Sequence, residues 1–390
     1  MQLMSARILL LQDAVYLPSF GGGNKANRLL LAALAERGFA CRAVSRLPGE
    51  RRVLAREFGA EGLAARGVSI AADGSYRHQG VDVLPLDFAA SGTAARIEAL
   101  VRDFEPDWIL ASDDRPALFL DIAPERTIAL VHTHFHLPFG PEAERHDARQ
   151  HDRLRRVRDV VAVSEYSRAY LREHGGIESS VLHFPVFGAG PFPRSAPDTG
   201  FVAMINPCDA KGLPIFLALA AGFRDTAFAA VPTWGGDPPV LETLARLPNV
   251  TLLDAVDDIG ALLARVRVLL APSLVPETFG YVAIDAMLRG IPVLAGNLGG
   301  QPEAKLGIDY TLPVTPLGSG EPQPIDAWHA ALETLLSDPL AYRRLSGASR
   351  DAAHLFLPQT DASQFVRHLE SLRDPARAAP PPARSPAAAG

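Results

Sequence analysis

The stretch PSLVPETFGYVAIDAMLRGIPVLAGNLGGQPE, residues 272–303, carries the most specific pattern in the chain. It predicts a strand, an acidic turn, a short helix, a second strand and a Gly-Gly turn that Glu303 closes. Glu277 precedes the expected helix, near its positive N-terminal end, and Asp285 lies eight residues further on, about two helical turns along. The pattern therefore predicts one strand–helix–strand unit that carries two carboxylates.

The start of this helix is the expected anion site. The backbone amides of Phe279 and Gly280 point outward there as phosphate ligands, because the first N–H groups of a helix have no acceptor within the helix. Glu277 and Asp285 are far enough apart to hold two separate sets of hydroxyls, one on a sugar and one on a ribose. The block therefore predicts a site for a ligand that carries both phosphate and sugar.

The same kind of unit recurs along the chain. Residues 7–12 and 201–206 are apolar strands, and each runs through a loop into a helical stretch, at 24–37 and 213–221 respectively. Short apolar strands that alternate with amphipathic helices indicate parallel sheets buried on both faces. Further strands are expected at 41–45, 81–84, 108–111, 127–131 and 160–163 in the first half, and at 228–231, 250–253, 268–271 and 292–295 in the second.

The domain organisation follows from a segment dense in proline and glycine, FPVFGAGPFP, which ends at Pro193. We expect Rossmann-like α/β domains on either side of it, with the carboxyl ends of their strands around a shared cleft. The expected boundaries are an N-terminal domain at 1–187, a linker at 188–200, a C-terminal domain at 201–358, a helix at 359–373 that can return to the N-terminal domain, and a disordered Pro/Ala-rich tail at 374–390.

Composition narrows the function classes. The 390 residues suit two domains of ordinary size, and 48% hydrophobic with 21% charged residues is the composition of a globular protein. The net charge of −6 argues against a nucleic-acid binder, which normally carries a basic surplus. Two cysteines, Cys41 and Cys208, form no disulfide framework. With no signal-peptide core and no apolar run of about 18 residues, we expect a cytoplasmic protein.

Two loops at strand ends are further candidates for phosphate binding. Gly22 and Gly23, with Gly21, precede the first helix and allow backbone amides to approach an anion. The alternative is that these glycines form a tight turn with a structural role alone. The dinucleotide fingerprint GxGxxG is absent. At the matching place in the second half, Asn206 and Lys211 follow a strand, and a lysine there can neutralise phosphate charge, although a solvated surface lysine is the alternative.

The 272–303 block resembles the signature of retaining GT-B glycosyltransferases of glycosyltransferase family 4, also called group 1. The family pattern is a glutamate, seven residues and a second glutamate, with Phe-Gly after the first acid. The segments 160–167, 205–212 and 249–258 are similar to other parts of the same fold. The resemblance covers most of residues 7–372.

This resemblance implies a GT-B architecture: two Rossmann-like domains with doubly wound parallel sheets that face a central cleft. It implies transfer of a hexose or related sugar from a nucleotide-diphosphate sugar, UDP- or GDP-linked, to an acceptor hydroxyl, with retention and without a metal ion or other cofactor. Lys211 would hold the donor pyrophosphate, Glu277 would contact the transferred sugar, and Asp285 would hold the ribose diol. The donor would lie against the C-terminal domain and the acceptor over the N-terminal domain.

Two departures from the family pattern keep alternatives open. Asp285 is one methylene shorter than the usual glutamate, and Asn206 stands where an arginine is usual, a variant that resembles a subgroup without that arginine. Two other functions remain open: the chain is a nucleotide-sugar epimerase of the same fold, or it is a non-catalytic protein that binds sugar nucleotides.

The segment LVHTHFHLPFG, residues 130–140, supplies the remaining candidates. The family has a histidine at this strand end beside the donor sugar; His132 fits it best and His134 is the second candidate, so the expected catalytic set is His132, Glu277 and Lys211. On the acceptor side we expect His134, with Tyr16 and Phe139 as apolar surface, which favours a small-molecule, lipid or peptide-like acceptor. Zinc binding by the alternating histidines is the alternative, but no cysteine or carboxylate at ligand spacing supports it, and we expect no metal.

Three charged clusters complete the candidates. The basic run from Arg153 to Arg158 predicts a solvated helical face, so membrane contact is possible but not indicated. The acid pairs at 113–114 and 257–258 are expected to start helices or to stabilise turns.

Overall fold

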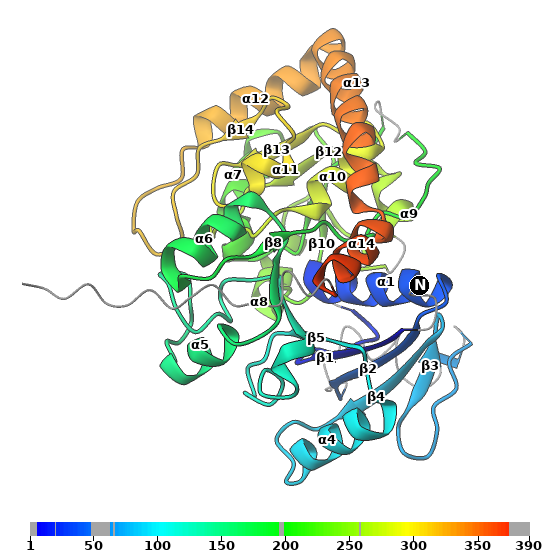
Figure 1. The fold of residues 1–390 in the computed structure, drawn as a ribbon. Helices are drawn as coiled ribbons and strands as arrows, with labels where there is room; N and C mark the ends of the chain where they lie inside the picture. Colours follow the sequence, from blue (N-terminus) through cyan, green and yellow to red (C-terminus); the bar gives the residue numbers. More distant parts are fainter. Residues whose placement is uncertain are drawn as a thin grey trace, which may run out of the picture.

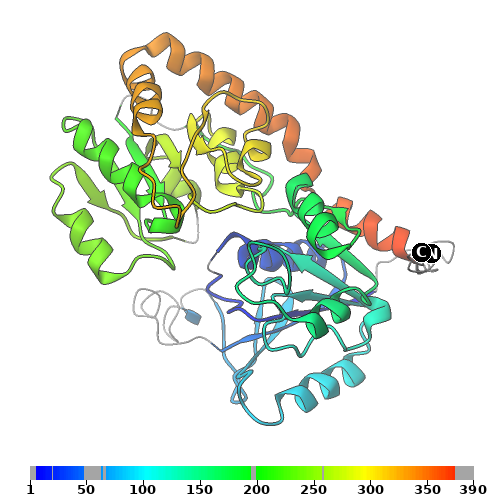
Figure 2. The same cartoon turned by 90° about the vertical axis from the view of Figure 1, so that its left-hand side faces the viewer.

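The computed structural model describes residues 6–19, 21–47, 63–64, 67–194, 199–256 and 259–373. A mainly parallel sheet organises each half of the chain, and helices cover the faces of both sheets (Figures 1 and 2). Figure 2 shows the C-terminal domain above the N-terminal domain, with the orange and red helices running down one side. The expectation of two doubly wound α/β domains is confirmed.

The sheet of the N-terminal domain has the strand order β3-β4-β2-β1-β5-β6-β7-β8, and only β3 is antiparallel to its neighbour within the described residues. Its central strands are continuous apolar runs with both faces buried, which is why they occupy the middle of the sheet. The strands are β1 (Arg7–Gln12), β2 (Ala40–Arg46), β3 (Tyr76–His78), β4 (Val81–Leu86), β5 (Trp108–Ser112), β6 (Thr127–Val131), β7 (Asp159–Ala162) and β8 (Ser180–Val181). The helices are α1 (Gly22–Glu36), α4 (Thr93–Phe104), α5 (Ala148–Leu154) and α6 (Glu165–Gly175), with the 3-10 turn η1 (Pro124–Arg126).

The sheet of the C-terminal domain is parallel, in the order β11-β10-β9-β12-β13-β14. The strands are β9 (Phe201–Ile205), β10 (Phe228–Val231), β11 (Val250–Leu252), β12 (Val266–Ala271), β13 (Val293–Gly296) and β14 (Thr311–Leu312). The helical elements are η2 (Asp209–Lys211), α7 (Leu213–Gly222), α8 (Pro238–Ala245), α9 (Ile259–Leu263), α10 (Tyr281–Leu288), α11 (Gln301–Ala304), α12 (Ile325–Ser337), α13 (Pro339–Phe356), η3 (Leu357–Thr360) and α14 (Ala362–Leu372).

The end of the chain crosses from one domain to the other. The long helix α13 packs against α10 in the C-terminal domain, and α14 then lies against α1 and the edge of the N-terminal domain (Figure 1). Arg37 of α1 pairs with Asp361 at 3.1 Å, and His368 Nε2 lies 2.7 Å from an oxygen of Asp159. The C-terminal helix therefore ties the two domains together behind the cleft.

The expected elements match the structure in most places. The strands expected at 7–12, 127–131 and 228–231 are observed with those bounds, and the bounds of the other expected strands differ by at most two residues at an end. The short strands β3, β8 and β14 were not expected, because two or three residues carry no periodicity. Residues 257–258 and the tail 374–390 lie outside the described residues. Among the helices that are described, none is long and apolar enough to cross a bilayer.

Candidate active site

A cavity of about 360 Å³ lies between the two domains, at the carboxyl ends of their strands. The N-terminal domain contributes the start of α1 and the end of β6, and the C-terminal domain contributes the loops after β9, β10 and β12. The cavity brings together every predicted catalytic and donor-binding residue: Gly22, Gly23, His132, Asn206, Lys211, Glu277, Phe279, Gly280 and Asp285.

An ion pair between Lys211 and Glu277 occupies the C-terminal side of the cavity. Lys211 Nζ donates to Glu277 Oε1, and Ser273 Oγ donates to the same oxygen at 2.8 Å. Burial raises the pKa of Glu277, but the Lys211 ammonium and the hydrogen bonds from Lys211 and Ser273 outweigh it, so the net pKa lies below its ordinary value. Glu277 is therefore ionised at neutral pH, and Lys211 offers its cationic head beside it.

The Gly-Gly turn of the 272–303 block explains how Glu277 is held. Gly300 N donates to Glu277 O at 2.6 Å, and Gly299 forms a bridge with Glu277. A Cβ atom on Gly299 would lie 2.4 Å from Glu277 O, and the φ of Gly299 is 65°, a left-handed conformation that favours glycine. The two glycines therefore let the turn after β13 press directly on the backbone that carries the carboxylate.

Two helices begin at the cavity with no side chain capping them. The N-cap of α10 is Gly280 and the N-cap of α1 is Gly21, and neither terminus has a side-chain hydrogen bond. By contrast, Ser164 caps α6 and Asp361 caps α14. Uncapped first-turn amides are donors that suit a bound phosphate, and the helix dipole adds favourable potential for an anion.

Asp285 and Asn206, the two residues that depart from the family pattern, each form a hydrogen bond within the C-terminal domain. Asp285 is 8% exposed and accepts a hydrogen bond from the Arg289 guanidinium one turn later in α10. Asn206 has a φ of 61° and accepts from Gly235 N at 2.7 Å through its side-chain oxygen, which holds the loop after β10. Both residues still line the cavity, but Asn206 adds no charge to it.

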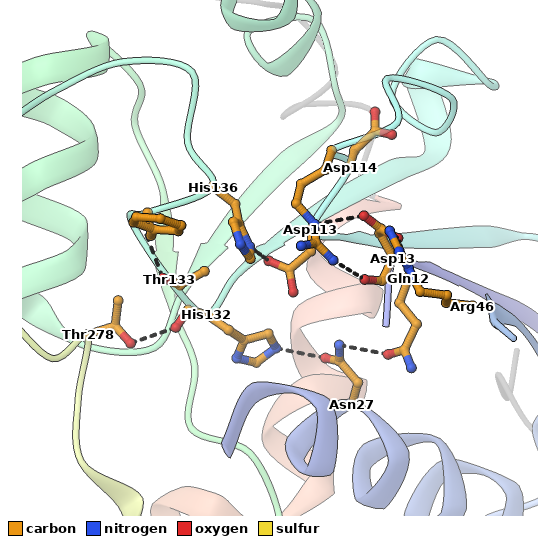
Figure 3. A network of polar contacts seen from close by, with 12 residues as sticks. Gln12, Asp13, Asn27, Arg46, Asp113, Asp114, His132, Thr133, His136 and Thr278 are labelled. Atoms are coloured by element: carbon orange, nitrogen blue, oxygen red, sulfur yellow. Dashed lines mark hydrogen bonds and ion pairs between the residues drawn. The ribbon is translucent and has the colours of Figure 1, made fainter. Parts of the chain in front are cut away.

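His132 enters the cavity from the N-terminal domain (Figure 3). A Cβ atom on Gly23 would lie 2.5 Å from the Cβ of His132, so only glycine allows α1 to start this close to the imidazole. Burial lowers the pKa of His132 to about 4 against the opposing charge of Asp113, so the ring is neutral at neutral pH.

Direct contacts across the domain interface surround this histidine. Thr278 Oγ1 donates to His132 O at 2.7 Å (Figure 3), and Ser164 Oγ donates to Thr278 O. The carboxylate of Glu303 accepts from the backbone N–H groups of Glu165 at 3.0 Å and Tyr166 at 3.2 Å, at the start of α6. The segment that carries Glu277 is therefore docked on the N-terminal domain beside His132.

The acceptor-side prediction needs correction. Tyr16 is fully buried in the core, Phe139 is buried against Gly175, and His134 is buried between Glu142 and Ser167, stacked on Tyr170. None of the three lines the cavity, so they do not form an apolar acceptor surface.

The physical reason lies in the end of β6. The strand stops at Val131, so residues 132–136 follow a turn and do not alternate as they would in a strand. His132 and His136 contact Asn27 and Asp113 respectively, away from His134. Within the described part of the chain, no three His, Cys, Asp or Glu side chains lie close enough together to hold a metal ion.

The charged clusters have mainly structural partners. Asp121 pairs with Arg153 and Arg156, each at 2.7 Å, and α5 ends at Leu154, so most of the basic run lies beyond the helix. Asp114 accepts from three consecutive backbone N–H groups that begin at Leu118, as the expected turn acid does.

Several residues that line the cavity were not predicted from the sequence, and two of them offer a charge or an aromatic ring to a ligand. Lys25 adds a second cation from α1, and Trp234, which is 44% exposed, lies after β10 with its ring 5.9 Å from Lys211 Nζ. An inspection of the residues after every expected strand end would have found Trp234. Lys25 carries no such signal, because it is one of many polar residues on an amphipathic helix.

This architecture and cleft define the GT-B class of glycosyltransferase folds. Sucrose-phosphate synthase from Thermosynechococcus elongatus superposes with a TM-score of 0.68 at 18% identity, over 94% of this chain and 99% of that one. HepE from Anabaena, solved in complex with UDP-glucose, gives 0.65 at 17% identity, over 93% and 98%. WaaG, a glycosyltransferase of lipopolysaccharide biosynthesis, gives 0.62 at 13%, over 94% and 100%.

A sequence comparison gives a match in the second half of the chain. Residues 196–338, which include Lys211, Glu277 and Asp285, match the family model described as Glycosyl transferases group 1. No curated protein sequence matches the chain significantly.

Proposed function

We propose that this protein transfers a hexose or related sugar from a nucleotide-diphosphate sugar to an acceptor hydroxyl, with retention and without a metal ion. The observation that carries the proposal is the Lys211–Glu277 pair, which lies in the interdomain cavity beside the uncapped start of α10. This arrangement combines a cation and backbone donors for phosphate with a carboxylate for sugar hydroxyls.

The donor is proposed to lie against the C-terminal domain. Its pyrophosphate would contact Lys211 and the amides of Phe279 and Gly280, and Asp285 would bind the ribose diol. Arg289 supports that role of Asp285, because the buried guanidinium donates to the carboxylate and so fixes its orientation. The complex of HepE with UDP-glucose supports a UDP-linked sugar as the first donor to test, with GDP-linked sugars second.

Charge on the leaving group is the main catalytic problem. When the bond between the sugar and the phosphate breaks, negative charge accumulates on the nucleotide diphosphate, and preorganised donors lower the barrier. Lys211 and the first turn of α10 supply such donors in a site that is shielded by both domains. Lys25 reaches the same cavity from the opposite domain, so it is a second candidate for this role.

His132 and Glu277 face the sugar from opposite domains in this proposal. The neutral imidazole can exchange hydrogen bonds with a sugar hydroxyl without adding positive charge, and Glu277 accepts from hydroxyls on the other side. Retention follows from the family resemblance, in which the leaving phosphate assists the acceptor and no enzymic nucleophile is required. The acceptor would enter over the N-terminal domain.

A two-part experiment tests the proposal. Thermal unfolding with UDP, GDP, ADP and TDP identifies the base, because a ligand that binds the native state raises its stability. The matching sugar nucleotides are then incubated with the enzyme in EDTA, with and without a panel of alcohols. Sugar transfer in EDTA is the expected result. Free nucleotide together with an altered sugar, formed without any acceptor, would instead indicate an epimerase, and binding without turnover would indicate a non-catalytic protein.

A further inference from the structure

A chain of hydrogen bonds leads from His132 into the N-terminal domain (Figure 3). His132 Nε2 lies 2.7 Å from Asn27 Oδ1, Asn27 Nδ2 lies 3.2 Å from Gln12 Oε1, and Gln12 Nε2 lies 3.4 Å from the backbone oxygen of Ala14. The side chains of Gln12 and Asn27 come from β1 and α1, and both residues are fully buried. Their amides therefore depend on each other for hydrogen bonds.

The direction of donation along these hydrogen bonds follows from the last acceptor, the backbone oxygen of Ala14. A backbone carbonyl can only accept, so Gln12 must present its NH₂ group to Ala14 and its oxygen to Asn27. Asn27 must then present its NH₂ group to Gln12 and its oxygen to His132. An oxygen can only accept, so Nε2 of His132 must carry the proton.

The opposite direction of donation leaves the carbonyl of Ala14 without a donor. If Nε2 accepted from Asn27, the amides of Asn27 and Gln12 would both turn over. Gln12 would then place an oxygen against the oxygen of Ala14, and two acceptors would face each other in a buried place. A buried polar group without a partner costs roughly 1–3 kcal/mol, so the first direction is strongly preferred.

The neutral ring has one proton, so the tautomer leaves Nδ1 as an acceptor. The pKa of His132 near 4 keeps the ring neutral, and among the described residues none hydrogen-bonds Nδ1. The ring lines the cavity, and in Figure 3 its second nitrogen faces away from Asn27. Nδ1 is therefore a hydrogen-bond acceptor in the wall of the cavity.

We propose that Asn27 and Gln12 are positioning residues that hold His132 as its Nε2–H tautomer, so that Nδ1 selects a hydroxyl over a carboxylate or ether at the matching place on the ligand. A hydroxyl donates to Nδ1, whereas a carboxylate or ether oxygen has no proton to donate. The identity of that ligand as the sugar of a nucleotide-diphosphate sugar rests on the proposed function, but the tautomer does not.

The tautomer is read directly by NMR of the full chain labelled with ¹⁵N-histidine. Two-bond and three-bond couplings to the ring carbons' protons distinguish Nε2–H from Nδ1–H, and the spectrum of His132→Gln assigns the signals among the 11 histidines. The expected result at pH 7.5 is a single Nε2–H form of His132. An Nδ1–H form would overturn the proposal even in the absence of any ligand.

Variants test the two positioning residues. Asn27→Leu removes the acceptor, so both tautomers should be populated, whereas Asn27→Asp keeps an acceptor and should keep the Nε2–H form. Gln12→Leu frees the Asn27 amide to turn over and should also mix the tautomers. An unchanged single Nε2–H form in both leucine variants would overturn the positioning role, and the spectrum of the wild-type protein remains decisive if a leucine variant fails to fold.

Ligand selection gives the second readout. In the wild-type protein, one monodeoxy analogue of the donor should bind about two- to tenfold more weakly than the intact donor, because one hydrogen bond is lost. This difference in affinity between the two ligands should shrink in Asn27→Leu but not in Asn27→Asp. Equal differences in all three proteins would overturn the selection role. If no sugar nucleotide binds at all, the proposed function fails, while the NMR result still decides the tautomer.

Discussion

Removal of the Lys211 charge should weaken nucleotide binding, whereas removal of the charge on its partner Glu277 should not. The ammonium and the Glu277 carboxylate are each about a quarter exposed and share a hydrogen bond in the cavity. In Lys211→Met the pyrophosphate loses a charged contact and meets an unbalanced carboxylate. Since a charged hydrogen bond contributes roughly 1.5–3 kcal/mol, and about 1.4 kcal/mol corresponds to tenfold, affinity for the nucleoside diphosphate should fall about 10- to 150-fold.

Glu277→Gln has the opposite expected sign for binding. The amide keeps the shape of the side chain but removes the charge that competes with phosphate for Lys211, so affinity for the nucleoside diphosphate should hold or rise. Sugar transfer should nevertheless fall, because the carboxylate that faces the sugar is lost. The double variant Lys211→Met/Glu277→Gln should recover part of the affinity lost in Lys211→Met, and the non-additivity measures the coupling between the two charges.

Calorimetric titration of UDP and GDP in EDTA measures these changes. Arg246→Ala is the matched control, because it removes a cation from the same domain on an exposed stretch of chain outside the cavity. Wild-type affinity in Lys211→Met would refute the reasoning, and so would an equal loss in Lys211→Met and Glu277→Gln.

Three further predictions concern the residues around this pair. Gly23→Ala should lower transfer at least tenfold with little change in nucleotide affinity, since its Cβ would lie 2.5 Å from His132. Gly347→Ala is the control in the same assays, because a Cβ on this residue of α13, outside the cavity, would meet no atom within 4 Å. Asp285→Ala should destabilise the fold by about 3–5 kcal/mol in urea unfolding, because it leaves the Arg289 guanidinium buried without its carboxylate, and a loss below about 1 kcal/mol would show the pair to be dispensable. The pKa of His132 lies near 4 in the native state and near 6.5 when unfolded, so the unfolded state binds more protons between these values and stability falls as the pH falls. Stability measured from pH 7 to 4 should therefore decline less steeply in His132→Gln, and parallel curves would contradict the shift.

Much of the fold could be predicted because it rests on local signals. Buried parallel strands are continuous apolar runs, so β6 and β10 could be located to the residue. The 272–303 block also predicted its own helix, strand and Gly-Gly turn, since a carboxylate before a helix and a Gly-Gly turn can be recognised without knowing the rest of the fold. Its contacts could not be predicted, because Glu277 pairs with Lys211 and Glu303 accepts from the start of α6. The edge strands β3 and β14 could not be predicted, because two or three residues show no periodicity, whereas the equally short edge strand β11 was expected as part of the longer run 250–253.

The site on the N-terminal side was harder to predict, because it depends on contacts between distant segments. His132 and His134 differ by two positions, yet one lines the cavity and the other is enclosed by Glu142 and Ser167. The difference follows from the turn after β6, which the sequence does not specify. The pairing of Asn27 with Gln12 likewise depends on how α1 packs on β1, and neither residue belongs to a motif.

Metal-independent transfer with retention is tested most directly by the stereochemistry of the reaction with the sugar nucleotide that stabilises the protein best. The enzyme is incubated with that α-linked donor in EDTA, with an accepted alcohol or with water alone, and proton NMR follows the anomeric signals from the first minutes, before free sugar can equilibrate. We expect release of the nucleoside diphosphate together with an α-configured product. A β-configured first product would contradict retention, and release that occurs only after a divalent metal is added back would contradict the roles assigned to Lys211 and the start of α10.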